Sequence, residues 1–301
     1  MSAPVSHLSD RAVVTPESIA DRVSQSTLVA SDAVAEYALG LGDDALILAH
    51  RLGEWIANAP ELEEDVALGN IGLDLLGHAR SLLTYAGSAG GHSEDDLAYF
   101  RGESEFRCRQ LFEQPIGDFG QTIARQFIAS IYFDLLYRQL VGSTDEMLAA
   151  IAAKAVKEVD YHLDHSIQWL LRLGLGTEES RFRMQRGLDA MWPFVDELFR
   201  SDAGVAGVDA AAGADSARSD TVRSDSAQGD PTALVGIAAD LEGMRAEFET
   251  RSVWHIEQAG LSVPRTPPAR GGGRRGVHSE AFGPLLAEMQ VLARAHPGAS
   301  W

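Results

Sequence analysis

Apolar residues recur three and four positions apart over much of this chain, and that periodicity limits the folds it can adopt. One face of the helix predicted at 61–87 carries Ile71, Leu75, His78, Leu82 and Tyr85. Gly87 is a typical helix stop. The same spacing predicts long helices at about 43–57, 119–141 and 144–173. No segment alternates convincingly like a strand, so the sequence predicts an all-α helical bundle.

The remaining segments divide into shorter helices and regions of low complexity. Shorter helices are expected at about 103–115, 179–199, 232–249 and 284–297. Residues 1–28 are small and polar, which predicts a disordered N-terminal arm. Residues 201–232 are mostly Ala, Asp, Ser and Gly and predict a disordered insertion. We therefore expect a single domain over 29–301 with extra C-terminal helices.

Composition excludes several classes of function. The formal charge of -19 opposes binding to nucleic acid, which needs a basic face. Cys108 is the only cysteine and has no flanking base, so neither a disulfide, a cysteine metal site nor a cysteine nucleophile is predicted. No apolar run approaches the roughly 18 residues that a membrane span requires, and the N-terminus lacks a signal peptide. These features predict a cytoplasmic protein without a membrane association.

Two of the predicted long helices carry a histidine in a setting typical of di-iron proteins. The stretch "KEVDYHLDH", residues 157–165, contains His162, and "GLDLLGHA" contains His78. Di-iron carboxylate bundles take one Glu from each of two helices and a Glu-x-x-His motif from each of two others. Here Leu75 and Val159 occupy the positions three residues before the histidines. Aliphatic side chains cannot bind iron, so the architecture fits such a site and the ligands do not.

A rearranged metal site is the alternative. Asp74 and Glu158 each lie four residues before a histidine, and this spacing also places both side chains on one helix face. Asp74, His78, Glu158 and His162 would then form the ligand set of a di-metal oxygenase. In the other interpretation the histidines are structural. Each would bond to the carboxylate four residues before it, or the two would meet across the core.

Two further groups are weaker candidates. His165 with Asp164 is interpreted as part of a solvated helix face. Arg270, Arg274 and Arg275 lie in the loop "ARGGGRRG", where guanidinium groups and exposed amides are suited to an anion or a partner protein. A mobile connector is the other interpretation of this loop.

Several stretches together resemble one known family. They include "LGDDALILAHRLGEWIANAPELEEDVALGNIGLDLLGHARSLLTYA", "EQPIGDFGQTIARQF", "AAIAAKAVKEVDYHLDHSIQWLLRLGLGTEES" and "RGGGRRGVHSEAFGPLLAEMQVLARAHPGASW". The chain resembles the C subunits of bacterial ring-1,2-phenylacetyl-CoA epoxidase over roughly 37–200 and 233–301. This resemblance implies a ferritin-like bundle and a place in a multicomponent monooxygenase of phenylacetate catabolism.

The resemblance also implies which subunit performs the chemistry. In that family a catalytic A subunit holds the di-iron centre, and a reductase subunit with a flavin (FAD or FMN) and an iron-sulfur cluster supplies electrons from NADPH. The C subunit is a paralogue that supports the A subunit in a tight hetero-oligomer. We therefore expect neither catalytic nor cofactor-binding residues in this chain.

The family pattern also locates the positions at which metal ligands would have been lost. It places the lost glutamates at Leu75 and Val159 and the retained histidines at His78 and His162. The glutamates of the other two helices fall near Ala45 and Ser130, with Asp44 and Asp134 close by but out of register. The implied site is vestigial, with no bound metal.

Overall fold

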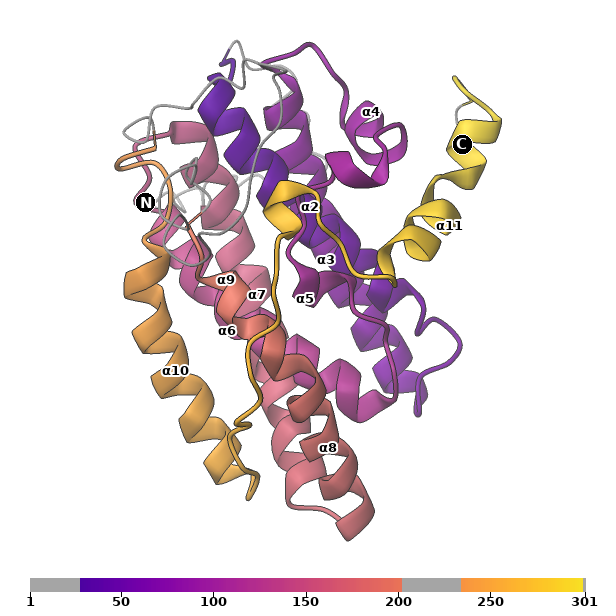
Figure 1. Ribbon diagram of the computed structural model, residues 1–301, viewed down its shortest axis with the longest axis vertical. Coiled ribbons are helices and arrows are strands. Elements are labelled where there is room, and N and C mark those ends of the chain that lie inside the picture. The colour runs from indigo at the N-terminus through magenta and orange to yellow at the C-terminus, as the bar shows by residue number, and fades with distance from the viewer. Residues whose placement is uncertain (1–27, 202–233, 300–301) are drawn as a thin grey trace, which may run out of the picture.

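The computed structural model describes residues 28–201 and 234–299. Within these ranges every regular element is helical, which confirms the predicted all-α fold (Figure 1). The predicted arm and insertion, apart from residues 28 and 201, lie outside the described residues. No helix in the described part combines the length and apolar character that crossing a bilayer requires.

Four long helices form the core of the bundle. They are α2 (Asp32–Gly53), α3 (Leu62–Gly87), α6 (Phe119–Leu140) and α7 (Glu146–Gly174). α2 packs against α3, α6 packs against α7, and α3 meets α7 (Figure 1). The predicted ranges for α3, α6 and α7 were therefore close to those observed.

α2 is longer at its N-terminus than predicted. It begins at Asp32 rather than near Asp43, because the Ser31 side chain accepts a hydrogen bond from the backbone N–H of Val34 and caps the helix. Gly42, which obscured the helical pattern, lies where α3 comes close: a Cβ there would be 2.8 Å from the side chain of Leu83.

The short segment between α4 (Glu94–Tyr99) and α6 is mostly extended rather than helical. Only η1 (Glu103–Glu105) and α5 (Gln110–Glu113) are helical within the predicted range 103–115. The backbone N–H groups of Arg107 and Arg109 donate to Asp43 and Asp44 of α2, at 2.7 and 2.8 Å. Buried carboxylates therefore take the donors that a continuous helix would have used.

The remaining helices pack around the core. They are α8 (Glu178–Met191), η2 (Trp192–Phe194), α9 (Val195–Leu198), α10 (Leu241–Gln258), η3 (Gly273–Arg275) and α11 (Phe282–Ala295). The helix predicted at 179–199 is interrupted at Pro193, which cannot donate a helical hydrogen bond. α10 begins later than predicted because Asp240 caps it, accepting from the N–H of Gly243.

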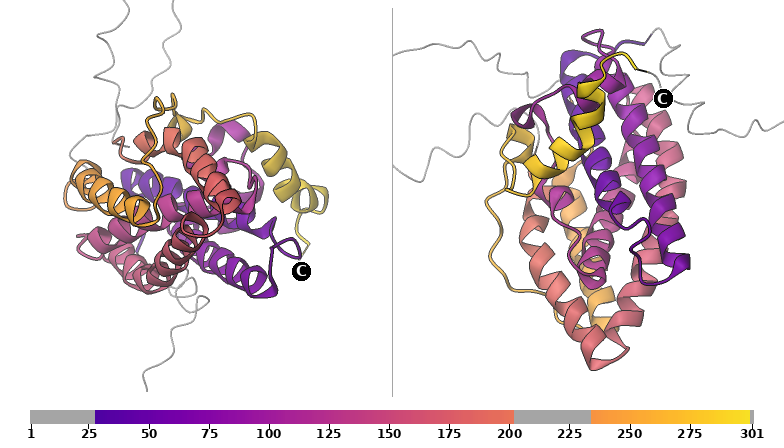
Figure 2. Two further views of the ribbon diagram at one scale, coloured as in Figure 1. Left: turned by 90° about the horizontal axis from the view of Figure 1, so that it is seen from below. Right: turned by 90° about the vertical axis from the view of Figure 1, so that its right-hand side faces the viewer.

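The segment that follows α10 returns along the bundle towards α2 (Figures 1 and 2). Its backbone meets η2 where the N–H of Ala269 donates to the carbonyl of Pro193 at 2.8 Å. This path brings the Arg-rich loop to the side of α2 that carries Asp44. A buried acid of α2 thereby gains a cationic partner from a distant part of the chain.

Candidate functional site

The two candidate histidines form hydrogen bonds across the contact between α3 and α7. Nε2 of His78 lies 2.7 Å from Oε2 of Glu158, and Nε2 of His162 lies 3.1 Å from Oδ2 of Asp74. Each histidine therefore pairs with the carboxylate of the other helix, not with the one four residues before it. The reason is geometric: an imidazole extends away from its own helix, and its outer nitrogen reaches the neighbour. The prediction of same-helix pairs was wrong.

A third pair of this kind was missed in the sequence. His165 is buried, and its Nε2 lies 2.8 Å from Oε2 of Glu64. The prediction that His165 belongs to a solvated face with Asp164 is therefore wrong; only Asp164 is exposed. The separation of Glu64 from His165 along the chain gave no signal that the two would meet.

We call these three pairs the α3–α7 ladder: His78–Glu158, His162–Asp74 and His165–Glu64. Their order fits antiparallel helices, because residues later in α3 pair with residues earlier in α7. The histidine side chains are buried, while those of Asp74, Glu158 and Glu64 are 33%, 22% and 11% exposed. In the first two pairs the imidazole is buried and the carboxylate is partly exposed, whereas His165 and Glu64 are both buried.

Burial determines the charge state of His78. It lowers the pKa of His78, and the hydrogen bond to Glu158 opposes that shift only in part. The neutral ring then donates from Nε2 to Glu158, and its Nδ1 has no hydrogen-bonding partner among the described residues. Burial alone would raise the pKa of Glu158, but the hydrogen bond to His78 and the nearby Lys154 bring it below its ordinary value.

The positions implied as lost ligands all lie inside the bundle. Leu75, Val159, Ala45 and Ser130 are buried. Three of these side chains are aliphatic and the fourth is a neutral hydroxyl. Metal-bridging carboxylates are thus absent at all four positions.

The two acids near those positions are bound by arginines instead. Asp44 accepts from Nη1 and Nη2 of Arg274 at 2.8 and 2.6 Å. Asp134 accepts from Nε of Arg138 and Nη1 of Arg251, both at 2.7 Å. Burial raises the pKa of Asp44, and Arg274 offsets part of that rise. Both acids therefore already have cationic partners within the chain.

The Arg-rich loop packs against the bundle rather than connecting two helices loosely. Glu197 accepts from the backbone N–H groups of Gly272 and Gly273 at 2.7 and 2.8 Å. Gly272 has φ 127°, and a Cβ at Gly273 would collide with the carbonyl of Cys108, so the turn requires glycine there. Arg274 binds an internal anion, while Arg270 and Arg275 remain exposed.

A buried group of metal-ligating residue types was also missed. Cys108, Glu113 and His278 bring one ligand atom each within 4.8 Å of the others. Nδ1 of His278 lies 3.0 Å from Glu113, its Nε2 lies 3.2 Å from the carbonyl of Phe106, and Ser279 N–H donates to Glu113 at 2.8 Å. Burial raises the pKa of the Cys108 thiol well above its usual range. Since His278 and Glu113 are both hydrogen-bonded to other protein groups, we interpret this cluster as a structural contact that joins the Arg-rich loop to α5.

The residues do not fit a pair of iron ions. Asp74, His78, Glu158 and His162 meet as two separate pairs. Among the described residues, no three of these four bring their ligand atoms within 4.8 Å of one another. The centroids of the two imidazole rings are 6.5 Å apart. We therefore derive no reaction step through a metal in this chain.

The fold and this polar core define a ferritin-like, all-α bundle whose buried acids are paired with protein cations and histidines. The chain belongs to the phenylacetic acid catabolic protein family, whose model matches residues 18–301. It is 44% identical over 266 residues to the C subunit of 1,2-phenylacetyl-CoA epoxidase from Escherichia coli (strain K12). The match covers 88% of this chain and 98% of that protein. The resemblance seen in the sequence is confirmed.

Proposed function

We propose that this chain is the non-catalytic C-type subunit of a cytoplasmic, NADPH- and O2-dependent phenylacetyl-CoA epoxidase. In this role it pairs with the di-iron catalytic subunit and stabilises it. The reductase subunit with its flavin and iron-sulfur cluster completes the complex. The observation that carries the proposal is the state of the inherited site: its ligand positions are apolar or neutral, and the nearby acids are paired within the chain.

Protein groups compensate the acids of this bundle in place of metal ions. Bridging carboxylates in a buried site need cations, because unpaired buried charges are strongly destabilising. Here arginines supply the charge for Asp44 and Asp134, and histidines bind the carboxylates between α3 and α7. These internal pairs support a bundle that needs no metal and serves as a rigid partner. An obligate interface of this kind buries upwards of roughly 2,000 Å² in total.

Co-expression with the catalytic subunit tests the proposal. We expect a stable hetero-oligomer in size-exclusion chromatography with mass determination, and far less than one iron per isolated chain. A chain that stays monomeric beside the catalytic subunit would contradict the proposed role. Near two irons per chain, lost in His78→Ala or His162→Ala, would instead support the rearranged di-metal oxygenase.

The same histidine variants provide a second measurement. In the assembled epoxidase, His162→Ala should leave kcat within roughly twofold of wild type, because a supporting subunit provides no group to the reacting atoms. Iron content of the complex is measured in parallel. A drop in kcat of about a hundredfold at full iron occupancy and intact assembly would place His162 in the chemistry and exclude a purely supporting role.

A further inference from the structure

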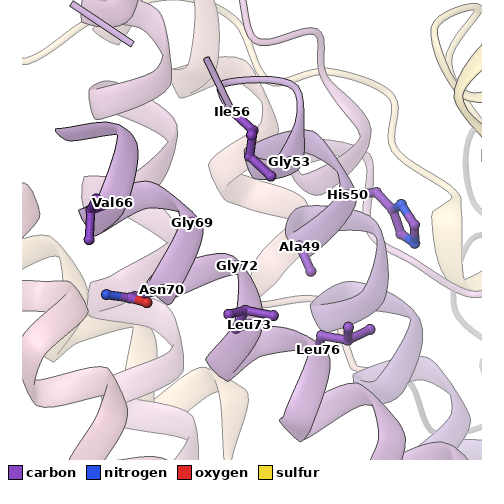
Figure 3. A pocket seen from close by; sticks show the side chains of 10 residues that line it. All are labelled: Ala49, His50, Gly53, Ile56, Val66, Gly69, Asn70, Gly72, Leu73 and Leu76. Carbon is purple, nitrogen blue, oxygen red and sulfur yellow. The ribbon is translucent and has the colours of Figure 1, made fainter. Parts of the chain in front are cut away.

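An open apolar groove lies on the outer face of the α2–α3 pair (Figure 3). It has a volume of about 420 Å³. Four large aliphatic side chains line it, and three of them, Ile56, Val66 and Leu73, are 62%, 56% and 65% exposed. Clustered exposure of this kind marks an interaction site more often than isolated apolar residues do.

The spacing of residues along the groove suits a helix. Along α3 the exposed and half-exposed positions Leu62, Val66, Gly69, Leu73 and Leu76 follow one another at intervals of four and three residues. This is the spacing of a seam that receives side chains from a second helix. A Cβ at Gly53 or Gly69 would meet nothing within 4 Å, so the floor is open to close approach.

The charged residues of α3 that border the groove are acidic. Neighbours three or four residues apart share a helix surface, so Glu63 borders Val66 and Asp74 borders Asn70. Arg80 is the only Lys or Arg of α3, and it is bound to Glu94. The one titratable lining residue, His50, has its pKa lowered by burial and is neutral at pH 7.

The acidic border of the groove favours some binding partners over others. A second copy of this chain, with net charge -19, would bring a similar acidic border against this one. An apolar helix bordered by lysines and arginines would match both the floor and the rim, and electrostatic complementarity of this kind favours one partner over another.

We propose that the α2–α3 groove binds an amphipathic helix of the epoxidase's catalytic subunit, with aliphatic residues on its buried face and basic residues at its edges. This inference rests on the proposed function and adds the surface and the chemistry of the contact. Leu73 and Val66 contribute the central apolar contacts, and Glu63 attracts the basic edge.

The test uses the full chain together with the catalytic subunit. Leu73→Arg and Val66→Arg introduce a charge into the groove and should weaken the association at least about tenfold, measured as Kd with purified subunits. Val291→Arg on α11 is the matched control, since Val291 is 63% exposed and lies outside the groove. It should leave Kd unchanged. Thermal unfolding of each isolated variant should match wild type, because the altered side chains are exposed.

A photo-crosslinking amino acid at position 73 identifies the occupant. We expect the crosslinked peptide to come from the catalytic subunit and to be a helical segment with lysine or arginine beside its apolar face. Wild-type affinity in both groove variants would overturn this inference while leaving the proposed function intact, and so would a crosslink to a second copy of this chain. Failure of the wild-type chain to bind the catalytic subunit would overturn both.

Discussion

Acids on the core helices of this bundle are paired in two different ways, depending on the helix that carries them. On α2 and α6, the fully buried Asp44 and Asp134 bind arginines, two of which come from outside the four core helices. Between α3 and α7, the acids of the ladder bind histidines; Asp74 and Glu158 are partly exposed, whereas Glu64 is buried. Arginine is charged at every accessible pH, whereas the charge of histidine depends on pH and environment.

The two kinds of pair therefore differ in whether the charge of the basic partner changes with pH. The fully buried Asp44 and Asp134 have cationic partners that are never lost, because arginine stays charged. Burial alone does not decide the partner, since the equally buried Glu113 pairs with His278. A carboxylate with partial access to water keeps some solvation and tolerates a neutral imidazole. Breaking the Asp44–Arg274 pair should therefore cost the most stability, and the His78–Glu158 pair of the ladder should make stability depend on pH.

Removing the arginine of the Asp44 pair should have the largest effect. Arg274→Met leaves Asp44 buried without its main cation and should lower the free energy of unfolding by about 3–5 kcal/mol. Urea unfolding followed by circular dichroism measures this change. Arg275→Met, exposed on the same loop, is the control and should change it by less than about 0.5 kcal/mol.

The double variant Asp44→Asn with Arg274→Met shows whether charge or packing causes the loss of stability in Arg274→Met. It should recover part of the lost stability, because no uncompensated charge then remains in the core. Equal losses in the single and double variants would show that Arg274 acts through packing rather than charge.

Breaking one rung of the ladder should have an intermediate effect. His78→Ala removes the hydrogen-bond donor to Glu158 and should cost about 1–3 kcal/mol. In a double-mutant cycle with Glu158→Ala, the two changes should couple by about 0.5–3 kcal/mol. The same cycle on His78 and Asp74 is the control and should give a smaller coupling, since those two residues do not pair. Equal coupling in both cycles would contradict the crossed arrangement.

The helical fold and the apolar ligand positions were predictable from the sequence. Spacing alone identified α3, α6 and α7, because long amphipathic helices carry a strong periodic signal. The same spacing showed that Leu75 and Val159 stand where a di-iron motif requires glutamate. Local sequence sufficed here because both features depend on residues of one helix.

The partners of the buried polar groups were not predictable in this way. Asp44 meets Arg274 through a loop that returns along the bundle, and Glu113 meets His278 in the same region. His165 meets a residue of another helix. Such pairs depend on tertiary packing over long chain separations, which periodicity does not encode. Acids within apolar stretches, Asp43 and Asp44 on α2 and Asp134 on α6, were the local signals of buried ion pairs.

The ladder should make stability depend on pH in a defined direction. Burial lowers the pKa of His78 below its ordinary value of 6.5, so the unfolded chain binds a proton more readily than the folded one. The contribution of His78 is complete above pH 6.5 and is lost as pH falls through the folded pKa. Urea midpoints between about pH 7.5 and 5.0 should therefore fall less in His78→Gln than in wild type.

His50→Gln is the comparison for this experiment. Burial also lowers the pKa of His50, so its replacement should reduce the same pH dependence without affecting the ladder. A His78→Gln variant with the full wild-type slope would show that His78 does not titrate differently in the two states. The His78–Glu158 pair would then not contribute to the pH dependence of stability, and the proposed difference from the Asp44–Arg274 pair would be lost.

The smallest expected effects compare two acids near His165. Glu64→Ala removes the partner of His165 and should cost about 1 kcal/mol, because a buried nitrogen loses its hydrogen bond. Asp164→Ala, next to His165 in the chain but exposed, should change the free energy of unfolding by less than about 0.5 kcal/mol. Chemical denaturation of both variants at neutral pH measures the difference. If Asp164→Ala were the more damaging change, His165 would depend on its sequence neighbour, and the ladder would have two rungs rather than three.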